Sequence, residues 1–295
     1  MEEIKGKIKA ALKSNKLTYS ILYPIWHVFH YITCYYKFVF LTSYRFKKNR
    51  FLYKHNLCHR FDAIKSYKGK YAGRCFIIAT GPSLTVEDFN KLKDEVTIGM
   101  NSLVKWFPKV GWETTFYGIQ DDIVFNNLRD DVCGISKSII FYNFNLYRQS
   151  KDYYKRLRSK QNSVEYPLYL ADHCIKLDST KGNKFSEDAS DIVYDGHTIA
   201  YSLLQIAVYM GFSKIYLIGT DCNYQGEVKH AIDNGVKHSE DQAVLYALGN
   251  QMIKSYVLAK EFADKHNVEI YNATRGGKLE VFPRVDLDEV LKNKQ

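Results

Sequence analysis

Short apolar runs that end on small or polar residues recur along most of this chain. The clearest is the run CFIIA at 75–79, which is followed by the turn residues TGPS at 80–83. A continuous apolar run is typical of a parallel strand that is covered on both faces of its sheet. Thr85 and Asp88 then have the spacing of a capping box, so the pattern predicts a strand, a tight turn and the start of a helix.

The same pattern predicts further elements. Strands are expected at 96–101, 114–119, 138–142, 214–218 and 268–271, and helices at about 86–93, 199–210 and 239–266. Alternation of strands and helices favours a parallel sheet with helices on both faces. Residues 147–189 are polar and irregular, which predicts a lid or an acceptor-site insertion. The expected fold over 69–295 is α/β, a Rossmann-like, doubly wound, mostly parallel sheet.

The first 68 residues have a different character and predict a basic, aromatic helical appendage. Residues 1–70 contain 15 Lys or Arg against 3 Asp or Glu, whereas residues 71–295 contain 27 against 29. A nucleic-acid-binding protein is expected to carry basic residues over its folded surface, so the pattern argues against a nucleic-acid partner. The basic excess instead describes a tail beside a nearly neutral domain.

Within the appendage, residues 17–36 contain no Lys, Arg, Asp or Glu but seven Tyr, Trp or Phe. Pro24, His27 and His30 make the stretch too polar for a typical spanning helix, and its aromatic side chains favour the headgroup level of a bilayer. Flanking basic residues suit anionic lipid. We expect residues 1–50 to associate with a membrane surface, which would place the protein in the cytoplasm, peripheral on the inner face of the cell membrane. The alternative is an aromatic hairpin that packs on the domain or on a partner.

Cysteine usage fits a reducing compartment. The six cysteines are scattered without CxxC or any metal-ligand spacing, so reduced thiols and no metal site are expected. Cys75 and Cys222 fall in or next to predicted strands, where packing is a simpler role than nucleophilic attack.

Polar residues follow each predicted strand, and in an open α/β sheet ligands bind outside the carboxyl ends of the strands. These positions are 80–83, Asn101, 120–122, 219–221 and 272–275. We expect all of them to face one cleft. An ordinary set of strand-to-helix turns is the alternative interpretation.

Four motifs occur in order: IIATGPSL at 77–84, GMNS at 99–102, GFSKIYLIGTD at 211–221 and IYNATRGGKL at 270–279. With them the chain resembles the 6-hydroxymethylpterin diphosphokinase MptE-like family, over about residues 70–290. Many bacterial members of that family accompany surface-polysaccharide genes. The resemblance implies a nucleotide-binding enzyme.

The motifs more distantly resemble family 42 bacterial sialyltransferases, which use a CMP-sugar without a metal. By this resemblance Asn101 and Asp221 match nucleotide-site positions, and 81–83 match the first turn. Thr80 and Gly118 replace asparagines of that pattern, and Asn250 falls roughly where that family has its catalytic histidine. The resemblance therefore implies a nucleotide more firmly than it implies sialic acid.

Transfer of a sugar from a nucleotide donor needs a phosphate cradle, ribose and base recognition, and a base for the acceptor hydroxyl. The expected nucleotide-binding residues are Thr80, Gly81, Pro82, Ser83, Asn101, Gly219, Thr220, Asp221, Asn272, Thr274 and Arg275. The expected catalytic residues are His197, Asp221 and His230, because histidine titrates near neutral pH. His238 is a further candidate base, and Tyr224 or Arg275 suits a leaving phosphate. The alternatives are a loop cap for Asp221 and a structural role for His197.

The preferred hypothesis is a glycosyltransferase-like enzyme of bacterial surface-polysaccharide biosynthesis. It would take a nucleotide-sugar donor and a glycan or lipid-linked acceptor, and it would require no cofactor. One alternative is a 6-hydroxymethyl-dihydropterin diphosphokinase that uses Mg²⁺ and ATP, for which Asp121, Asp122 and Asp221 offer carboxylates. No Walker-type phosphate loop is present, which disfavours an ordinary P-loop kinase. A non-catalytic protein of polysaccharide assembly is the other alternative, and the sequence leaves the oligomeric state open.

Overall fold

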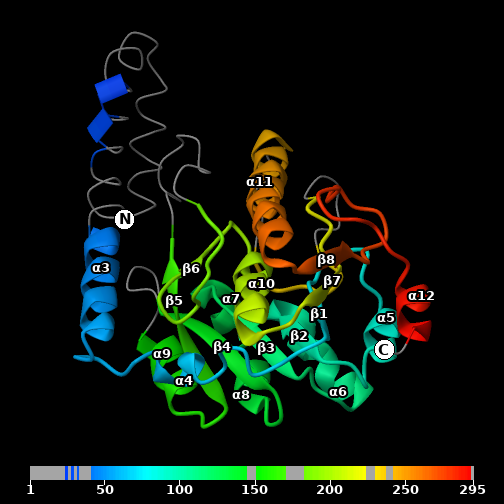
Figure 1. Ribbon diagram of the computed structural model, residues 1–295, viewed down its shortest axis with the longest axis horizontal. Coiled ribbons are helices and arrows are strands. Elements are labelled where there is room, and N and C mark those ends of the chain that lie inside the picture. Colours follow the sequence, from blue (N-terminus) through cyan, green and yellow to red (C-terminus); the bar gives the residue numbers. More distant parts are fainter. Residues whose placement is uncertain are drawn as a thin grey trace.

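The computed structural model describes residues 24–25, 28–29, 32, 41–144, 151–170, 183–223, 230–236 and 242–293. Its centre is one eight-stranded sheet with helices on both faces (Figure 1). The strands are β1 (Arg74–Ile78), β2 (Thr97–Met100), β3 (Phe116–Ile119), β4 (Ile139–Phe144), β5 (Ser163–Tyr169), β6 (Val193–Tyr194), β7 (Lys214–Ile218) and β8 (Glu269–Asn272).

The strand order is β6-β5-β4-β3-β2-β1-β7-β8, and every neighbouring pair is parallel. From β1 the chain builds the sheet in one direction as far as β6, then returns to place β7 and β8 on the other side of β1. This reversal is the topological switch point of a doubly wound sheet. The predicted Rossmann-like α/β fold is confirmed.

Two layers of helices cover the sheet. One face carries α5 (Val86–Lys91), the 3-10 helix η2 (Asn101–Trp106), α6 (Phe107–Val110), α7 (Asp122–Asn127), α8 (Arg129–Gly134), α9 (Lys151–Arg158) and α12 (Leu287–Lys292). The other face carries α4 (Asp62–Lys65), α10 (Ile199–Met210) and α11 (Gln242–His266), with α3 (Leu41–Lys54) at the β5–β6 end of the sheet (Figure 1).

The apolar run of β1 is continuous because its side chains alternate between these two layers. Cys75 and Ile77 join the core under α10, whereas Phe76 and Ile78 join the core under α5. On the α5 side Phe76 stacks on Tyr216 of β7 with ring centroids 5.0 Å apart. Tyr216 in turn stacks on Tyr271 of β8 at 5.3 Å, so three adjacent strands share one row of rings. The predicted turn after β1 is followed by the predicted capping box. The Thr85 side chain accepts from the Asp88 N–H, and the Asp88 side chain accepts from the Thr85 N–H.

Residues 183–189 form no helix or strand, as predicted, but the prediction that 147–189 as a whole is an irregular insertion is wrong for residues 151–170. That part contains helix α9 and strand β5, and β5 pairs in parallel with β4 along five residues. Val164, Tyr166 and Leu168 alternate into the core under α10. Glu165 and Pro167 occupy the alternate positions, so the period of two is present in the sequence, but Pro167 argues against a strand. It is tolerated because β5 has only the two-residue strand β6 on its other side.

The appendage joins the body through helix α3 and the segment behind it. Phe46 of α3 is buried and packs edge-to-face on Tyr169 at the end of β5, with centroids 5.2 Å apart. Arg50 and Lys54 form ion pairs with Asp191. Phe61 and Ile64 belong to the main core. Most of the predicted membrane segment at 17–36 lies outside the described residues.

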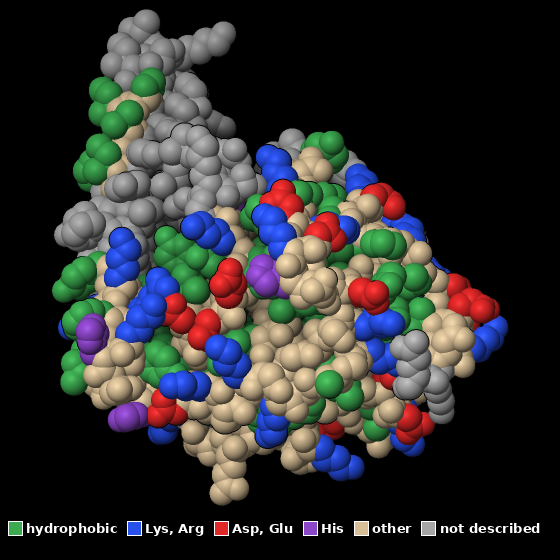
Figure 2. Space-filling model, viewed as in Figure 1, with side chains coloured by type: hydrophobic (Ala, Val, Ile, Leu, Met, Phe, Trp, Pro, Cys, Tyr) green, Lys and Arg blue, Asp and Glu red, His purple; other side chains and the backbone are tan. Residues whose placement is uncertain are grey.

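Charged side chains of both signs are interspersed over the face of the body that Figure 2 shows. This agrees with the nearly equal numbers of acidic and basic residues after residue 70. Within the described part of the chain, no helix combines the length and the apolar character that crossing a bilayer requires.

Candidate functional site

One cleft lies at the switch point, where the carboxyl ends of β1, β2 and β7 meet the start of α10 and the middle of α11. The space inside it, open solvent included, is about 500 Å³, of which about 70 Å³ can hold a water-sized group. The predicted site residues that line this first cleft are Thr80, Gly81, Pro82, Asn101, Gly219, Thr220, Asp221 and His230. Segments far apart in the sequence therefore converge here.

Asp221 lies in the wall of the first cleft and is 7% exposed. Its Oδ2 accepts a 2.8 Å hydrogen bond from the Ser83 hydroxyl, and a Cβ added at Gly81 would overlap this oxygen. Burial raises the pKa of the Asp221 carboxyl above its ordinary value, although the hydrogen bonds from Ser83 and the charge of Arg284 oppose the rise. A buried carboxylate with a raised pKa suits a general base. Gly81 is thus required first of all for close packing against this carboxylate.

The loops around the first cleft hold non-glycine residues in the left-handed region. Asn101 has φ +48° and Cys222 has φ +49°, and both line the cleft. His197, which precedes the cleft residue Thr198, has φ +64°. Such conformations cost free energy and concentrate at functional sites. The Asn101 carbonyl accepts a 2.6 Å hydrogen bond from the Tyr117 hydroxyl, which fixes the backbone there.

The Cys222 thiol is not poised for attack, because burial and the nearby charge of Asp221 raise its pKa to about 12. Cys75 is fully buried in strand β1, and burial raises its pKa as well. A thiol needs a lowered pKa to act as a nucleophile. The prediction that these two cysteines are packing residues is consistent with this placement.

His230 reaches the first cleft on a strap, residues 230–236, which crosses the ends of β1 and β2. The Ala231 N–H donates to the Thr80 carbonyl at 2.9 Å, and the Ser102 hydroxyl donates to the Ile232 carbonyl at 2.8 Å. Lys105 and Asn127 donate to the next carbonyls of the strap. His238, the further candidate base, lies outside the described residues, as does Tyr224.

His197 is next to the first cleft but does not line it, whereas Thr198 does. The His197 N–H donates to Oδ2 of Asp195 at 3.1 Å, and Oδ1 of Asp195 accepts from Gln120 at 2.6 Å. Gln120 accepts in turn from the Tyr166 hydroxyl at 2.9 Å. This chain of bonds ties the His197 loop to the end of β3 and to the middle of β5. Gln120 thus has a positioning role, which its place at a strand end alone does not reveal.

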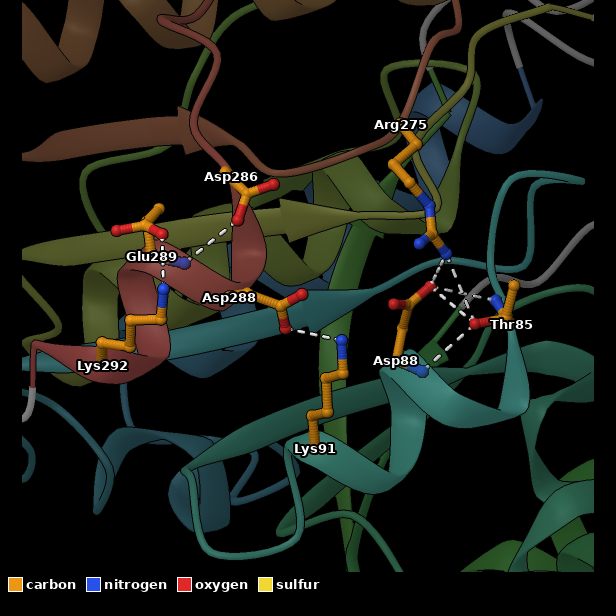
Figure 3. A network of polar contacts seen from close by, with 8 residues as sticks. All are labelled: Thr85, Asp88, Lys91, Arg275, Asp286, Asp288, Glu289 and Lys292. Atoms are coloured by element: carbon orange, nitrogen blue, oxygen red, sulfur yellow. Dashed lines mark hydrogen bonds and ion pairs between the residues drawn. The ribbon is translucent and has the colours of Figure 1, made fainter.

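A second cleft lies on the α5 side of the same sheet edge, between the turn after β1, the loop after β8 and the start of α12. Ser83, Gly219, Thr274 and Arg275 line it, whereas residues 120–122 and Asn272 line neither cleft. The expectation that all the strand-end residues face one cleft is therefore wrong. Arg275 forms an ion pair with Asp88 (Figure 3). Gly219 lines both clefts, and the Ser83–Asp221 hydrogen bond passes between them.

Asn272 and Thr274 hold the loop after β8 in place. The Asn272 side chain donates to the Leu279 carbonyl at 2.7 Å and accepts from the Thr274 N–H at 2.9 Å, and it is 1% exposed. Thr274 Oγ1 accepts from the Thr220 N–H at 3.0 Å. Lys278 N–H then donates to the Asp221 carbonyl at 2.7 Å. Asn272 and Thr274, which were expected to bind the nucleotide, therefore hold the loop after β8 against the backbone at Thr220 and Asp221.

Other elements bring to the clefts residues that the sequence did not indicate. Met252 and Tyr256, four apart on α11, line the first cleft, and Arg284, Asp286 and Asp288 line the second. The spacing of the α11 pair marks one helix face, but it does not distinguish core from cleft.

Asp221 alone carries a carboxylate among the described residues that line the first cleft. Asp121, an expected metal ligand of the diphosphokinase alternative, caps α7 by accepting from the N–H groups of Ile123 and Val124. In the part of the chain that the structure describes, no group of three His, Cys, Asp or Glu side chains is arranged to hold a metal ion.

The fold defines a doubly wound α/β protein with a cleft at the switch point. A family model described as 6-hydroxymethylpterin diphosphokinase MptE-like matches residues 49–227, and the chain belongs to this family. The match begins about 20 residues before the span that the motifs predicted and ends before the β8 motif. It therefore includes the second part of α3, with Arg50.

A search of curated proteins gives no match. Among solved structures, the chain is similar to a MAf glycosyltransferase from Magnetospirillum magneticum AMB-1, with a TM-score of 0.44 and 14% sequence identity. The similarity covers 77% of this chain and 38% of that protein, so the chain spans well under half of its length. A likeness at this level does not establish a shared function.

Proposed function

We propose that this protein is a glycosyltransferase-like enzyme of bacterial surface-polysaccharide biosynthesis, which uses a nucleotide-activated sugar. One observation carries the proposal: the polar residues that follow β1, β2 and β7 converge on one cleft at the switch point. Cofactors and substrates of doubly wound folds bind at this place. The cleft also contains Asp221, a buried carboxyl with a raised pKa that suits removal of a proton from an acceptor hydroxyl.

In this proposal the turn at 80–82 and Thr220 hold the donor phosphate, and Asn101 binds the nucleoside. Asp221 is the base, and His230 on its strap faces the same cleft as a second candidate. No cofactor is needed for this chemistry. The distant resemblance suggests a CMP-sugar as the donor.

A thermal-shift screen with CMP, UDP, GDP, ATP and their sugar conjugates tests the proposal. Binding to the first cleft is expected to raise the melting temperature of the wild-type protein, because a ligand that binds only the folded state stabilises it. Asn101→Gly should abolish the shift. If no nucleotide raises the melting temperature, the proposal is wrong.

The description of the family supports a second candidate function, an Mg²⁺- and ATP-dependent hydroxymethyldihydropterin diphosphokinase. The same screen separates the two, because only the kinase requires ATP together with Mg²⁺. Stabilisation by ATP that depends on Mg²⁺, with turnover of the pterin, would favour the kinase. Stabilisation by a nucleotide sugar in the presence of EDTA would favour the transferase.

We further propose that the appendage binds an anionic membrane surface and keeps the enzyme close to a lipid-linked acceptor on the cytoplasmic face. Support comes from the basic excess of residues 1–70 and from four exposed apolar residues spaced as on one helix face: Ile25, Val28, Phe29 and Ile32. Helix α3 runs antiparallel to β5, so its start lies beyond the carboxyl end of that strand (Figure 1). The start of α3 therefore lies on the same side of the sheet as the clefts.

Sedimentation with vesicles tests this part. The wild-type protein should sediment with vesicles that contain phosphatidylglycerol, and a variant without residues 1–40 should remain in the supernatant. This truncation leaves α3 intact, so Phe46 still packs on the body. Equal sedimentation of both proteins would reject the membrane role.

A further inference from the structure

The second cleft shares a wall with the first. It encloses about 910 Å³, part of it open to solvent, and Ser83 and Gly219 form its border with the first cleft. The Ser83 hydroxyl faces this cleft yet donates to Oδ2 of Asp221, which lines the other. A group bound in the second cleft would therefore lie one hydrogen bond away from the proposed base.

Four of the five charged side chains that line the second cleft form ion pairs. Arg275 is paired with Asp88, and Arg284 with Glu280. Asp288 is paired with Lys91, as Figure 3 shows, and Asp286 caps α12 by accepting from the Glu289 N–H at 3.0 Å. A ligand with a net charge would compete with these ion pairs. An uncharged ligand that both donates and accepts hydrogen bonds would not.

Sugar hydroxyls have this character, since each one donates one hydrogen bond and accepts others. Arg275 remains 62% exposed in its ion pair and offers further N–H donors to the cleft. Ile218, Ala273 and Leu287 supply an apolar wall for the C–H face of a sugar ring. The cleft thus combines donors, acceptors and an apolar surface, and among its described residues Asp286 is the one charged side chain outside an ion pair.

From this geometry we infer that the second cleft is the acceptor subsite and takes an uncharged, hydroxyl-rich group of the glycan class. The inference rests on the proposed function and adds the place and the chemical class of its second substrate. Ser83 connects the two clefts. The acceptor oxygen forms a bond to the anomeric carbon of the donor while the bond from that carbon to the nucleotide phosphate breaks. The acceptor proton passes to Ser83 Oγ as the Ser83 proton passes to the Asp221 carboxylate, and the nucleotide leaves with the electron pair.

Saturation-transfer NMR with methyl glycosides of glucose, galactose, mannose and N-acetylglucosamine tests the inference. At least one glycoside should receive saturation from the wild-type protein, and should still do so when a nucleotide saturates the first cleft. Arg275→Ala should weaken glycoside binding about tenfold, the usual effect of losing a hydrogen bond to a charged group. The Asp88 carboxylate keeps its 2.8 Å bond from the Thr85 hydroxyl in this variant, so the fold should persist.

Lys91→Ala is the matched control. It also removes one ion pair between α5 and the C-terminal segment, but Lys91 does not line the cleft (Figure 3). It should leave glycoside binding unchanged. Equal losses in both variants, no glycoside binding at all, or displacement of the glycoside by nucleotide would overturn the inference.

Nucleotide binding in the same samples keeps the two proposals apart. If nucleotides bind and glycosides do not, the acceptor subsite is wrong and the proposed function stands. If glycosides bind through Arg275 and no nucleotide binds, the glycan site is supported and the proposed function fails. Ser83→Ala completes the test, because it should slow sugar transfer while both ligands still bind.

Discussion

The Ser83 hydroxyl donates a 2.8 Å hydrogen bond to Oδ2 of Asp221, which links the turn after β1 to the loop after β7. These two strands are neighbours only because the chain returns to the far side of β1 after building β6. The bond thus crosses the switch point itself. Burial has already raised the pKa of Asp221, and the bond moderates that rise.

Asp221→Asn should separate chemistry from stability. Because the pKa is raised in the folded state, Asp221 contributes stability that is present below its ordinary value of 3.8 and is lost as the pH rises through the raised pKa. At neutral pH the variant should therefore be at least as stable as the wild type. Turnover of the donor should fall about 100-fold or more, as for loss of a general base.

Urea unfolding at several pH values and a donor-turnover assay measure both effects. A loss of unfolding free energy above about 2 kcal/mol at neutral pH would contradict this account, since it would show that the charged carboxylate is a structural acceptor. Ser83→Ala should raise the pKa of Asp221 further, because it removes a hydrogen bond that favours the charged form.

Gly81→Ala should damage the first cleft through packing. The added Cβ would overlap the Asp221 carboxylate and the Gly219 carbonyl, so the turn after β1 must move. We expect a loss of about 1–3 kcal/mol, typical of overpacking, together with loss of nucleotide binding. Thermal unfolding and nucleotide titration measure the two effects.

Gly134→Ala at the end of α8 is the control for that substitution. A Cβ at Gly134 meets nothing within 4 Å, and its φ is not positive. This variant should be neutral or more stable by up to about 1 kcal/mol, because alanine restricts the unfolded chain. If both glycine variants behave alike, the close packing of Gly81 on Asp221 does not matter in solution.

Asn101 combines a left-handed backbone, φ +48°, with a place in the first cleft. Asn101→Ala should therefore lose nucleotide binding and also about 1–2 kcal/mol of stability, because alanine fits this backbone poorly. Asn101→Gly should keep its stability and lose only the binding. The comparison isolates the side chain from the backbone.

Asn267 provides the control, since it has φ +56° just after α11, is exposed and lines neither cleft. Asn267→Gly should leave both nucleotide binding and the melting temperature nearly unchanged. Nucleotide binding by Asn101→Gly at the wild-type affinity would remove Asn101 from the list of ligand residues.

The sequence was most informative where local chemistry and burial agree. The run at 75–79 is apolar at every position because both faces of β1 are covered, and Thr85 and Asp88 form the predicted capping box. Helix α10 and strand β7 have the predicted bounds. In these segments propensity, periodicity and tertiary contacts favour the same structure.

The sequence was less informative where a role depends on which segments meet. Asn272 comes at the end of a predicted strand as Asn101 does, yet its side-chain amide forms hydrogen bonds within the loop after β8. The division into two clefts also follows from topology, because α10 and α5 cover opposite faces of the same strand ends. No local pattern distinguishes a side chain that faces a ligand from one that supports its neighbour.

The ion pairs of Asp191 with Arg50 and Lys54 predict how α3 is attached. Burial alone raises the pKa of Asp191, but hydrogen bonds from Arg50 and Lys54 lower it, and the net shift is downward. This contribution is therefore present above the ordinary pKa and is lost as the pH falls through the lowered one. Asp191→Asn should weaken the docking of α3 by about 1 kcal/mol, allowing for solvent screening of the exposed part of Arg50.

Hydrogen exchange measures this attachment directly. Amides of α3 should exchange about fivefold faster in Asp191→Asn, whereas amides of β1 should not change, because the ion pairs of Asp191 lie at the edge of the fold. Asp264→Asn is the matched control, since it also breaks a lysine ion pair but does so within α11. Unchanged exchange of α3 in Asp191→Asn would mean that the packing of Phe46 on Tyr169 holds the helix without the ion pairs of Asp191.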